Sequence, residues 1–372
     1  MMIYYIGVAI ALFLSTLLLT KKSKAKADWI LAIWLIIIAL HLGAYSLAIT
    51  KEIFEFPYLL GYEKLLPLLH GPFLYLYLRA SIKKEPWSWK TALHFIPLLA
   101  GFALILPFLV LNSAAKISIY LNRGSGFTDT TKALLIGGLL SGFVYSIMTI
   151  LEIRRYQKQI KNNYSQIEKI NLQWLLLLTI GLFLIWIVVF IASDPYIFTA
   201  CVVYVILIGY YGIKQTNVFA ALPTEPPSTA PTATNINDQS NETVKYEKSL
   251  VKEPQLAAIK AELEVLMHEK KLFLTPELTL TMVANQLQVH PNSLSQVINR
   301  TEQKNFFDYI NYLRIKEFKK KLANAENEQY TIIGLAYECG FNSKTAFNRN
   351  FKIFTGCSPS EYIKSQKKNH HR

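Results

Sequence analysis

Seven long runs of apolar side chains occupy the first 215 residues of the chain, and they constrain its fold more than any other feature. They cover about residues 3–20, 29–49, 58–79, 92–111, 133–151, 172–192 and 196–213. Each run approaches or meets the roughly 20 residues that a helix needs to cross about 30 Å of hydrocarbon. No comparable run follows them, so the sequence predicts a seven-helix transmembrane domain over residues 1–215.

The composition of the 372-residue chain agrees with this prediction. Hydrophobic residues make up 52% of the chain and charged residues only 17%, whereas ordinary soluble domains carry roughly 25% charged residues. The 39 Lys and Arg outnumber the 25 Asp and Glu, which gives a formal net charge of +14. An apolar chain with a basic excess suits a protein that lies partly in lipid and also meets a polyanion or an anionic membrane face.

The loops between the predicted spans give the expected orientation. Loops one, three and five hold 13 Lys or Arg, whereas loops two, four and six hold 4. Because Lys and Arg are enriched in cytoplasmic loops, the N-terminus is expected outside a bacterial cytoplasmic membrane and the C-terminal half inside. An alternative is that the first run is a signal peptide cleaved after Ala25-Lys26-Ala27. Four lysines follow this run and none precedes it, which favours an uncleaved anchor.

A polar stretch separates the two halves of the chain. Residues 222–254 are rich in Pro, Thr, Ser and Asn, and they almost lack large apolar side chains before Val244. Such a segment cannot bury enough surface to fold, so residues 216–253 are predicted to form a flexible linker. The linker argues against rigid transmission between the halves, and it favours control through dimerisation or proteolytic release. The remaining residues, 254–372, carry 17 Lys or Arg and 11 Asp or Glu.

The C-terminal half begins with helical periodicity. Leu256, Ile259, Leu263 and Leu266 recur at a spacing of three or four, which predicts a helix. Its apolar stripe either packs on its own domain or forms a short dimer seam, although two heptads make a weak coiled coil.

Residues 279–300 predict a first helix-turn-helix unit, with residues 288–290 as its turn. Pro291 suits the first turn of the second helix, where a missing N–H costs little. The side chains expected to face inward are Val283, Ala284, Leu287, Leu294, Val297 and Ile298. Those expected to face outward are Asn292, Ser293, Ser295, Gln296 and Asn299. Amide and hydroxyl side chains of this kind can read base edges, and Asn or Gln can pair with adenine through two bonds.

A long amphipathic helix is expected next, at residues 305–324, where it would span about 30 Å. Its inward side chains are Phe306, Tyr309 or Ile310, Leu313 and Phe318, and its solvated ones are Lys316, Lys319, Lys320 and Lys321. This length is close to the ~34 Å between successive major grooves on one face of DNA. One chain could therefore address two neighbouring grooves.

Residues 331–354 predict a second helix-turn-helix unit. Gly340 supplies a turn that often needs a positive φ, and Asn342 or Ser343 caps the next helix. Its inner face carries Phe347, Phe351 and Phe354. Its outer face carries Ser343, Lys344, Thr345, Asn348, Arg349 and Lys352. Arg349 could pair with guanine or grip a phosphate, and Ser358 to Glu361 read as a capping box of a last helix.

Two stretches of this half resemble the AraC/XylS-type transcription regulators. They are "LAYECGFNSKTAFNRNFKIFTGCSPSEY" and "NSLSQVINRTEQKNFFDYINYLRIKEFKKKL" within residues 270–365. The resemblance implies that residues 291–300 and 343–354 are the recognition helices. It implies DNA contacts by Asn292, Ser295, Gln296, Lys344, Thr345, Asn348 and Arg349. The chain departs from the family at Gln288, where the family often has Gly. The membrane half is similar to the multi-span sensors that some bacteria fuse to such modules.

The third apolar run contains ionisable side chains, which are functional candidates inside a membrane span. Glu63, Pro67 and His70 fall on one face of a continuous helix, in which Pro67 would produce a kink. Three interpretations stay open here. Glu63 and Lys64 pair or snorkel at the outer interface, Glu63 and His70 form a sensing pocket for a ligand or proton, or they line a transport path.

The sequence thus predicts an all-α protein: a seven-span sensor domain, a linker and a cytoplasmic tandem helix-turn-helix domain of AraC type. The predicted function is membrane-anchored, sequence-specific transcription regulation, and the alternative is a transporter or receptor whose tail binds proteins. The expected partners are promoter DNA, the lipid bilayer, a second copy of the chain, RNA polymerase and a small-molecule or membrane-borne signal. No enzyme motif, cofactor or metal site is expected, and the spacing of Cys201, Cys339 and Cys357 suggests none.

Overall fold

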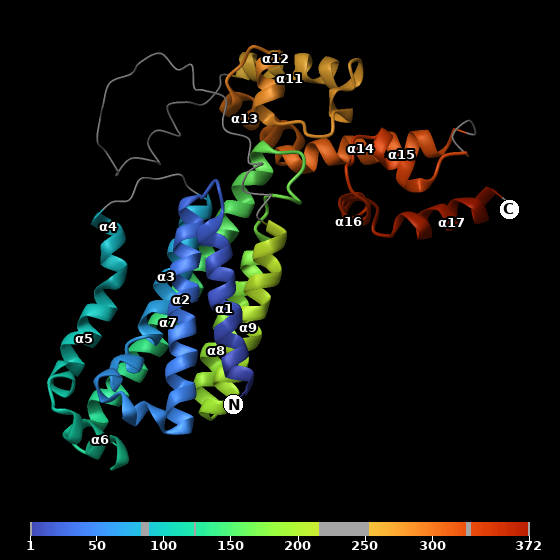
Figure 1. The fold of residues 1–372 in the computed structure, drawn as a ribbon. Helices are drawn as coiled ribbons and strands as arrows, with labels where there is room; N and C mark the ends of the chain where they lie inside the picture. Colours follow the sequence, from blue (N-terminus) through green and yellow to red (C-terminus); the bar gives the residue numbers. More distant parts are fainter. Residues whose placement is uncertain (1, 83–88, 123, 216–252, 325–328, 371–372) are drawn as a thin grey trace. The chain divides into compact units, whose positions relative to one another are not determined.

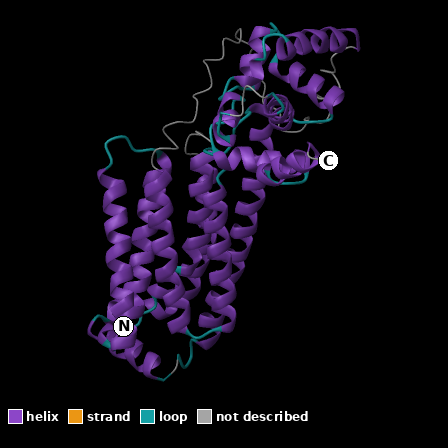
Figure 2. Ribbon diagram, turned by 90° about the vertical axis from the view of Figure 1, so that its right-hand side faces the viewer, coloured by secondary structure: helices purple, strands orange, loops and turns teal. Residues whose placement is uncertain are grey.

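The structure is a computed structural model that describes residues 2–82, 89–122, 124–215, 253–324 and 329–370. Every named element among these residues is a helix, as Figure 2 shows, in agreement with the all-α prediction. The chain divides into two compact units. One comprises residues 1–156 and 172–222, and the other comprises residues 157–171 and 223–372.

The first unit consists mainly of long apolar helices that lie side by side (Figure 1). Its α-helices are α1 (Met2–Thr20), α2 (Lys26–Thr50), α3 (Pro67–Ile82), α4 (Trp89–Ala92), α5 (Ile96–Leu109), α6 (Ser113–Leu121), α7 (Thr128–Asn163), α8 (Gln173–Ile191) and α9 (Asp194–Gln215). Its 3-10 turns are η1 (Glu52–Glu55), η2 (Pro57–Leu59), η3 (Tyr62–Lys64) and η4 (Leu93–Phe95). The last residues of α7 belong to the second unit.

Six helical segments in the described part of the chain are long and apolar enough to cross a membrane. They are Met2–Thr20, Lys26–Thr50, Trp89–Leu109, Thr128–Asn163, Gln173–Ile191 and Asp194–Gly212. These helices expose many large apolar side chains, among them Phe13, Leu140 and Phe190. Soluble proteins rarely expose so much apolar surface, so the helices suit lipid better than water. The first unit therefore has the features of a multi-pass membrane domain.

The third apolar run does not form the continuous helix that the sequence predicted over residues 58–79. Pro57 begins η2, and Gly61 adopts a φ of +97°, which interrupts helical geometry before η3. The α-helix α3 begins at Pro67 and has 16 residues, which correspond to about 24 Å. Pro67 therefore starts a helix instead of kinking one, because a proline at the first helical position loses no hydrogen bond.

The core of the first unit is apolar and closely packed. Trp34 and Leu35 of α2, Leu74 of α3 and Leu175 of α8 are almost completely buried in one cluster. The approach between α7 and α8 is close at Gly142, where a Cβ would overlap the Trp186 ring. Only glycine fits at this position unless the neighbouring ring moves.

The second unit contains the helices of the C-terminal half. They are α11 (Glu253–His268), η5 (Leu272–Leu274), α12 (Leu280–Gln286), α13 (Pro291–Glu302), α14 (Phe306–Leu322), α15 (Ile332–Glu338), α16 (Lys344–Thr355) and α17 (Pro359–His370). The structure does not describe residues 216–252, so the predicted flexible linker at 216–253 lies almost wholly outside the described residues.

Helix α14 joins two separate apolar cores. Its Phe306, Ile310 and Leu313 belong to a core with α11, α12 and α13, and its Phe318 belongs to a core with α15 and α16. The predicted inward face of this helix is therefore confirmed, although its 17 residues correspond to about 25 Å and not 30 Å. Leu263 and Leu266 of α11 lie in the first core, which confirms that this helix packs on its own domain.

Candidate nucleic-acid interface and membrane-domain cavity

The first helix-turn-helix unit is formed by α12 and α13, as the sequence predicted. The Thr279 hydroxyl accepts a hydrogen bond from the Met282 amide at 3.2 Å and begins α12. The turn places Gln288 at a φ of +54°, the left-handed region that favours glycine. Although Gln288 is not a glycine, the backbone still makes the turn between α12 and α13 at this position. His290 then caps α13, and Pro291 occupies its first turn.

Helix α13 presents a polar face. Leu294, Val297 and Ile298 are buried beneath it, which leaves the predicted outward residues on the other side. Asn292 and Asn299 are exposed, and Ser293, Ser295 and Gln296 are half-buried. The side-chain amide of Asn299 lies 3.4 Å from the Ser295 hydroxyl. This face carries hydrogen-bonding groups and no charge before Arg300. Amide and hydroxyl side chains of this kind can contact base edges as well as phosphates.

The second helix-turn-helix unit is formed by α15 and α16. Gly340 has a φ of +87°, and a Cβ there would lie 2.7 Å from the Leu274 carbonyl oxygen, so the predicted glycine turn is confirmed. Of the two predicted caps, Ser343 takes this role, because its hydroxyl accepts from the Ala346 amide at 3.1 Å. Phe347 and Phe351 are completely buried under α16.

Helix α16 presents the basic outer face that the sequence predicted. Lys344, Thr345, Arg349 and Lys352 are exposed, whereas Ser343 and Asn348 are half-buried. The Arg349 guanidinium donates to the Glu168 carboxylate at 2.7 Å and lies 5.7 Å from the Phe307 ring centre. The sequence identified Arg349 as a candidate DNA contact but gave no sign that an acidic residue 181 positions away would pair with it.

The second unit also contains a buried arginine that the sequence did not predict. Arg314 of α14 is fully buried, and its guanidinium donates to the carbonyl oxygens of Phe273 at 2.8 Å and Thr275 at 2.7 Å. Burial lowers the pKa of Arg314 to about 9, so the side chain is still charged at neutral pH. One signal in the sequence could have found it, because Arg314 lies between two apolar residues, Leu313 and Ile315. Both of these neighbours are buried as well.

The last helix begins with the predicted capping box. The Ser358 amide donates to the Glu361 carboxylate at 2.7 Å, and the Glu361 amide donates to the Ser358 hydroxyl at 3.3 Å. These hydrogen bonds stabilise the ionised carboxylate and hold the pKa of Glu361 below its usual range.

A cavity of about 620 Å³ lies within the first unit. Its lining includes the two candidate sensing residues, Glu63 and His70, together with His41, Lys64, Tyr120 and Asp194. The two candidates reach it from different elements, since Glu63 lies on η3 and His70 on α3, so their predicted position on one helix face is wrong. The Tyr120 hydroxyl donates to Glu63, and Lys64 Nζ lies 3.9 Å from the same carboxylate.

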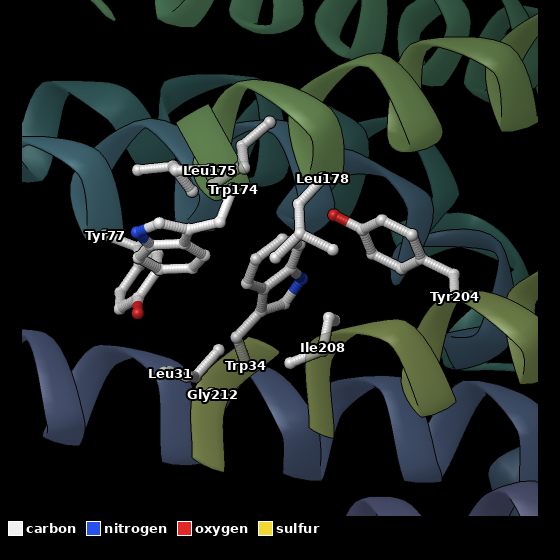
Figure 3. Close-up of a pocket in the computed structure, with 10 residues that line it drawn as sticks. Leu31, Trp34, Tyr77, Trp174, Leu175, Leu178, Tyr204, Ile208 and Gly212 are labelled. Atoms are coloured by element: carbon white, nitrogen blue, oxygen red, sulfur yellow. The ribbon is translucent and has the colours of Figure 1, made fainter. Parts of the chain in front are cut away.

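A chain of hydrogen bonds leads to the cavity from Trp34. Its indole N–H donates to His70 Nδ1 at 3.2 Å, and His70 Nε2 lies 3.1 Å from His41 Nδ1. Because indole only donates, His70 Nδ1 accepts, and its Nε2–H donates to His41. In a neutral His41 the remaining proton is then on Nε2. Figure 3 shows the Trp34 ring among Leu178, Ile208 and Tyr204, which line a small void of about 10 Å³ beside it.

The comparisons with known proteins concern the C-terminal half. A family model of a helix-turn-helix domain matches residues 283–365, a range that begins in α12 and ends in α17. Comparisons with curated proteins and with solved structures gave no match. The matched range includes both recognition-helix candidates and their connecting helix. The C-terminal part of the chain is therefore an AraC-type helix-turn-helix DNA-binding domain.

Proposed function

We propose that the chain is a membrane-anchored transcription regulator that binds promoter DNA in a sequence-specific manner. The observation that carries this proposal is the pair of helix-turn-helix units that α14 joins. The matched range, residues 283–365, covers most of both units. The first unit of the structure supports membrane anchoring through its six candidate spans. Regulation by DNA binding needs no catalytic residue, and we assign no enzymatic activity to the chain.

The two outer faces have different roles in this proposal. On α13, Asn292, Ser295 and Gln296, flanked by Ser293 and Asn299, read base edges through amide and hydroxyl groups. On α16, Arg349 pairs with guanine or phosphate. Phosphate contacts and further base contacts come from the cap residue Ser343 and from Lys344, Thr345, Asn348 and Lys352 of α16. The face of α13 selects A·T pairs more readily than G·C pairs, because it lacks Arg and Lys before Arg300.

The proposed topology has seven crossings, with α3 as the third. At about 24 Å this helix is shorter than the hydrocarbon layer, but η3 directly precedes it and extends the crossing. Close contacts support its place among the other spans, since a Cβ at Gly71 would lie 3.0 Å from Tyr145 of α7. With seven crossings, the basic loops put the N-terminus outside and the DNA-binding domain in the cytoplasm.

The signal that we propose is a small molecule, either external or membrane-borne, that enters the 620 Å³ cavity. This volume lies within the range of ordinary ligand sites. The Nε2–H of His41 and the Lys64 ammonium are donors, which suits a ligand whose head group accepts hydrogen bonds, such as a carboxylate or carbonyl. Apolar side chains such as Ile38, Leu182 and Ile185 would cover the rest of the ligand.

Variants of the cavity test the signal separately from DNA binding. Glu63→Gln and His70→Gln are expected to change the output of a reporter gene without lowering the amount of protein in the membrane. His70→Gln interrupts the hydrogen bonds between Trp34 and His41, whereas Glu63→Gln keeps the shape of the side chain. Leu140→Ala on the lipid-facing side of α7 is the matched control, since this residue is 61% exposed and does not line the cavity. Unchanged output in both cavity variants would contradict a sensing role.

The whole chain in lipid nanodiscs tests the main proposal. We expect it to enrich a common motif from a pool of random-sequence DNA duplexes, with an affinity that falls steeply as salt increases. A homodimer would enrich two half-sites, and RNA polymerase would be recruited beside them. Binding without any sequence preference at moderate salt would favour the alternative, a receptor or transporter whose tail binds proteins.

A further inference from the structure

Residues 157–171, which comprise the last turns of α7 and most of its connection to α8, belong to the same compact unit as the DNA-binding domain. Tyr164 forms an antiparallel β-bridge with Thr279, the cap of α12. Next to it, both the amide and the hydroxyl of Ser165 donate to the Leu278 carbonyl oxygen, at 3.1 Å and 2.6 Å. The segment is therefore joined to the start of the first helix-turn-helix unit by the β-bridge and by two hydrogen bonds from Ser165.

The same segment contacts the buried polar residues of α14. The Asn311 side-chain amide donates to the Ser165 carbonyl oxygen at 3.0 Å, and Arg314 Nη2 lies 3.3 Å from the Ser165 hydroxyl. Asn311, Arg314 and Ser165 are at most 1% exposed. Polar groups buried this deeply need partners, and Ser165 supplies one to each of the two α14 side chains. Asn311 and Arg314 thus form a polar binding site for this segment, hereafter part of the seat, in the middle of the apolar face of α14.

The contacts continue to the second helix-turn-helix unit. The Gln166 side-chain amide donates to the Gly340 carbonyl oxygen at 3.0 Å, in the turn between α15 and α16. Residues 164–166 therefore touch both helix-turn-helix units and the helix that joins them. Residues 164–166 therefore hold the two helix-turn-helix units in one relative position. These hydrogen bonds would have to break before the two helix-turn-helix units could separate or rotate.

The segment also reaches the recognition helix itself. Glu168 Oε1 lies 2.7 Å from Arg349 Nη2, the α16 side chain best suited to guanine or phosphate. A DNA phosphate or base acceptor needs the same guanidinium edge. DNA that approached α16 would also bring its negative charge against the Glu168 carboxylate, which is only 22% exposed at its side chain. Glu168 and DNA therefore compete for Arg349.

We propose that residues 164–168 are an intramolecular ligand of the DNA-binding domain, hereafter the latch. The latch occupies the seat formed by Leu278, Asn311, Arg314 and Gly340, and it covers Arg349 with Glu168. DNA binding through α16 requires Glu168 to leave Arg349. The latch state has low DNA affinity, and its release produces the active state.

The latch also has a covalent route to the membrane domain. Helix α7 is continuous from Thr128 to Asn163, the residue before Tyr164. Its first turns contribute Thr131 and Leu134 to the cavity lining, and α8, which follows the latch, contributes Leu182 and Ile185. A ligand that shifts α7 relative to α8 would therefore pull on both ends of the latch. This step rests on the proposed sensing function, whereas the competition between Glu168 and DNA rests on the proposed DNA binding through α16.

A charge-removing variant tests the competition at Arg349. Glu168→Gln in the whole chain is expected to raise affinity for duplex DNA by about two- to fivefold, the range of a partly exposed ion pair. Glu277→Gln is the matched control, because Glu277 is an exposed acid beside the seat and has the same charge. An equal increase in both variants would show a general charge effect and would contradict the specific role of Glu168.

A reversible cross-link tests the latch as a whole. Tyr164→Cys and Thr279→Cys together place two thiols at the β-bridge, where facing residues are close enough for a disulfide. The oxidised double variant is expected to bind DNA at least tenfold more weakly than the same protein after reduction, while each single variant does not respond to oxidation. Comparison within one variant removes the effect of losing the Thr279 cap.

The DNA probe is selected first, from a pool of random-sequence duplexes, by the wild type or by Glu168→Gln. The enriched duplexes then serve to measure the DNA affinities of all variants. Enrichment by neither protein would contradict the proposed function and the latch together. Enrichment with equal affinities in the oxidised and reduced double variant would contradict the latch alone. Failure of the two cysteines to form a disulfide in the membrane-embedded chain would show that the segment does not occupy its seat.

Discussion

Arg314 provides the sharpest test of how the DNA-binding domain is held together, because it is a charged residue that the structure buries completely. Its guanidinium donates to the carbonyl oxygens of Phe273 at 2.8 Å, Thr275 at 2.7 Å and Pro276 at 3.1 Å. Phe273 lies in η5, and Thr275 and Pro276 lie in the segment between η5 and α12. Arg314→Ala removes every one of these bonds and leaves the three carbonyl oxygens without this donor.

The size of the effect follows from these contacts. A hydrogen bond to a charged group contributes about 1.5–3 kcal/mol, but neighbouring bonds are not additive. Breaking a buried charged network typically costs about 3–5 kcal/mol in total. We therefore expect Arg314→Ala to lower the free energy of opening of α14 by at least 3 kcal/mol, or roughly 100-fold in the opening constant. Arg314→Lys keeps the charge but not the planar fork, so it should lie in between.

Hydrogen exchange measured by mass spectrometry on the whole chain in nanodiscs reports this opening directly. The amides of α14 should exchange about 100-fold faster in Arg314→Ala than in the wild type, whereas α1 and α2 should not change. Lys316→Ala, on the exposed side of the same helix, is the control and should stay within about 0.5 kcal/mol of the wild type. Equal exchange in Arg314→Ala and the wild type would refute the buried guanidinium network.

Three further predictions concern the turn, the recognition helix and the last cap. Gln288→Gly should stabilise the first helix-turn-helix unit by up to about 1 kcal/mol, seen as slower exchange in α12 and α13, because it relieves a left-handed φ; faster exchange would contradict this. Arg349→Ala should weaken binding to the enriched motif about 5- to 150-fold, and Lys364→Ala only slightly; equal losses would mean that α16 presents another face. The pKa of Glu361 is depressed in the folded state, so its contribution to the stability of α17 is complete above the ordinary carboxyl pKa and is lost as pH falls through the lower folded-state value. The protection factor of the Tyr362 amide, which corrects for the slower intrinsic exchange at low pH, should fall in this range in the wild type but not in Glu361→Gln.

Local signals explain why the helix-turn-helix units could be predicted from the sequence. Pro291, Ser343 and Ser358 each act within four residues of their own position, and the structure has each of them at a helix start. The apolar spacing of Phe347 and Phe351 gave the buried face of α16 in the same way. Such features depend on backbone geometry and burial that neighbouring residues already determine.

Contacts between residues that are far apart in the sequence explain what could not be predicted. The carbonyl partners of Arg314 lie about 40 positions away, and the partner of Arg349 lies 181 positions away, in a loop that the sequence assigned to the membrane domain. In the third apolar run, hydropathy alone suggested one helix, whereas Pro57 and Gly61 break it into 3-10 turns before α3. Glu63 and His70 still line one cavity, but they reach it through tertiary packing and not through helical spacing.

The second connection between the halves changes how a signal could travel. A flexible linker alone favours dimerisation or proteolytic release. The contacts of Ser165, Gln166 and Glu168 provide another route, in which α7 and α8 act on the DNA-binding domain through the latch. The two routes predict different effects of the Tyr164→Cys and Thr279→Cys cross-link, since only the latch requires this segment to move.

Genome-wide mapping of the DNA that is cross-linked to the intact chain in membranes tests the central claim most directly. The account predicts discrete bound sites that share a motif and that disappear in the Arg349→Ala variant, while the amount of protein in the membrane stays the same. Recovered DNA that shows no shared motif, or the same sites in the wild type and in Arg349→Ala, would contradict a membrane-anchored regulator that reads DNA through α16.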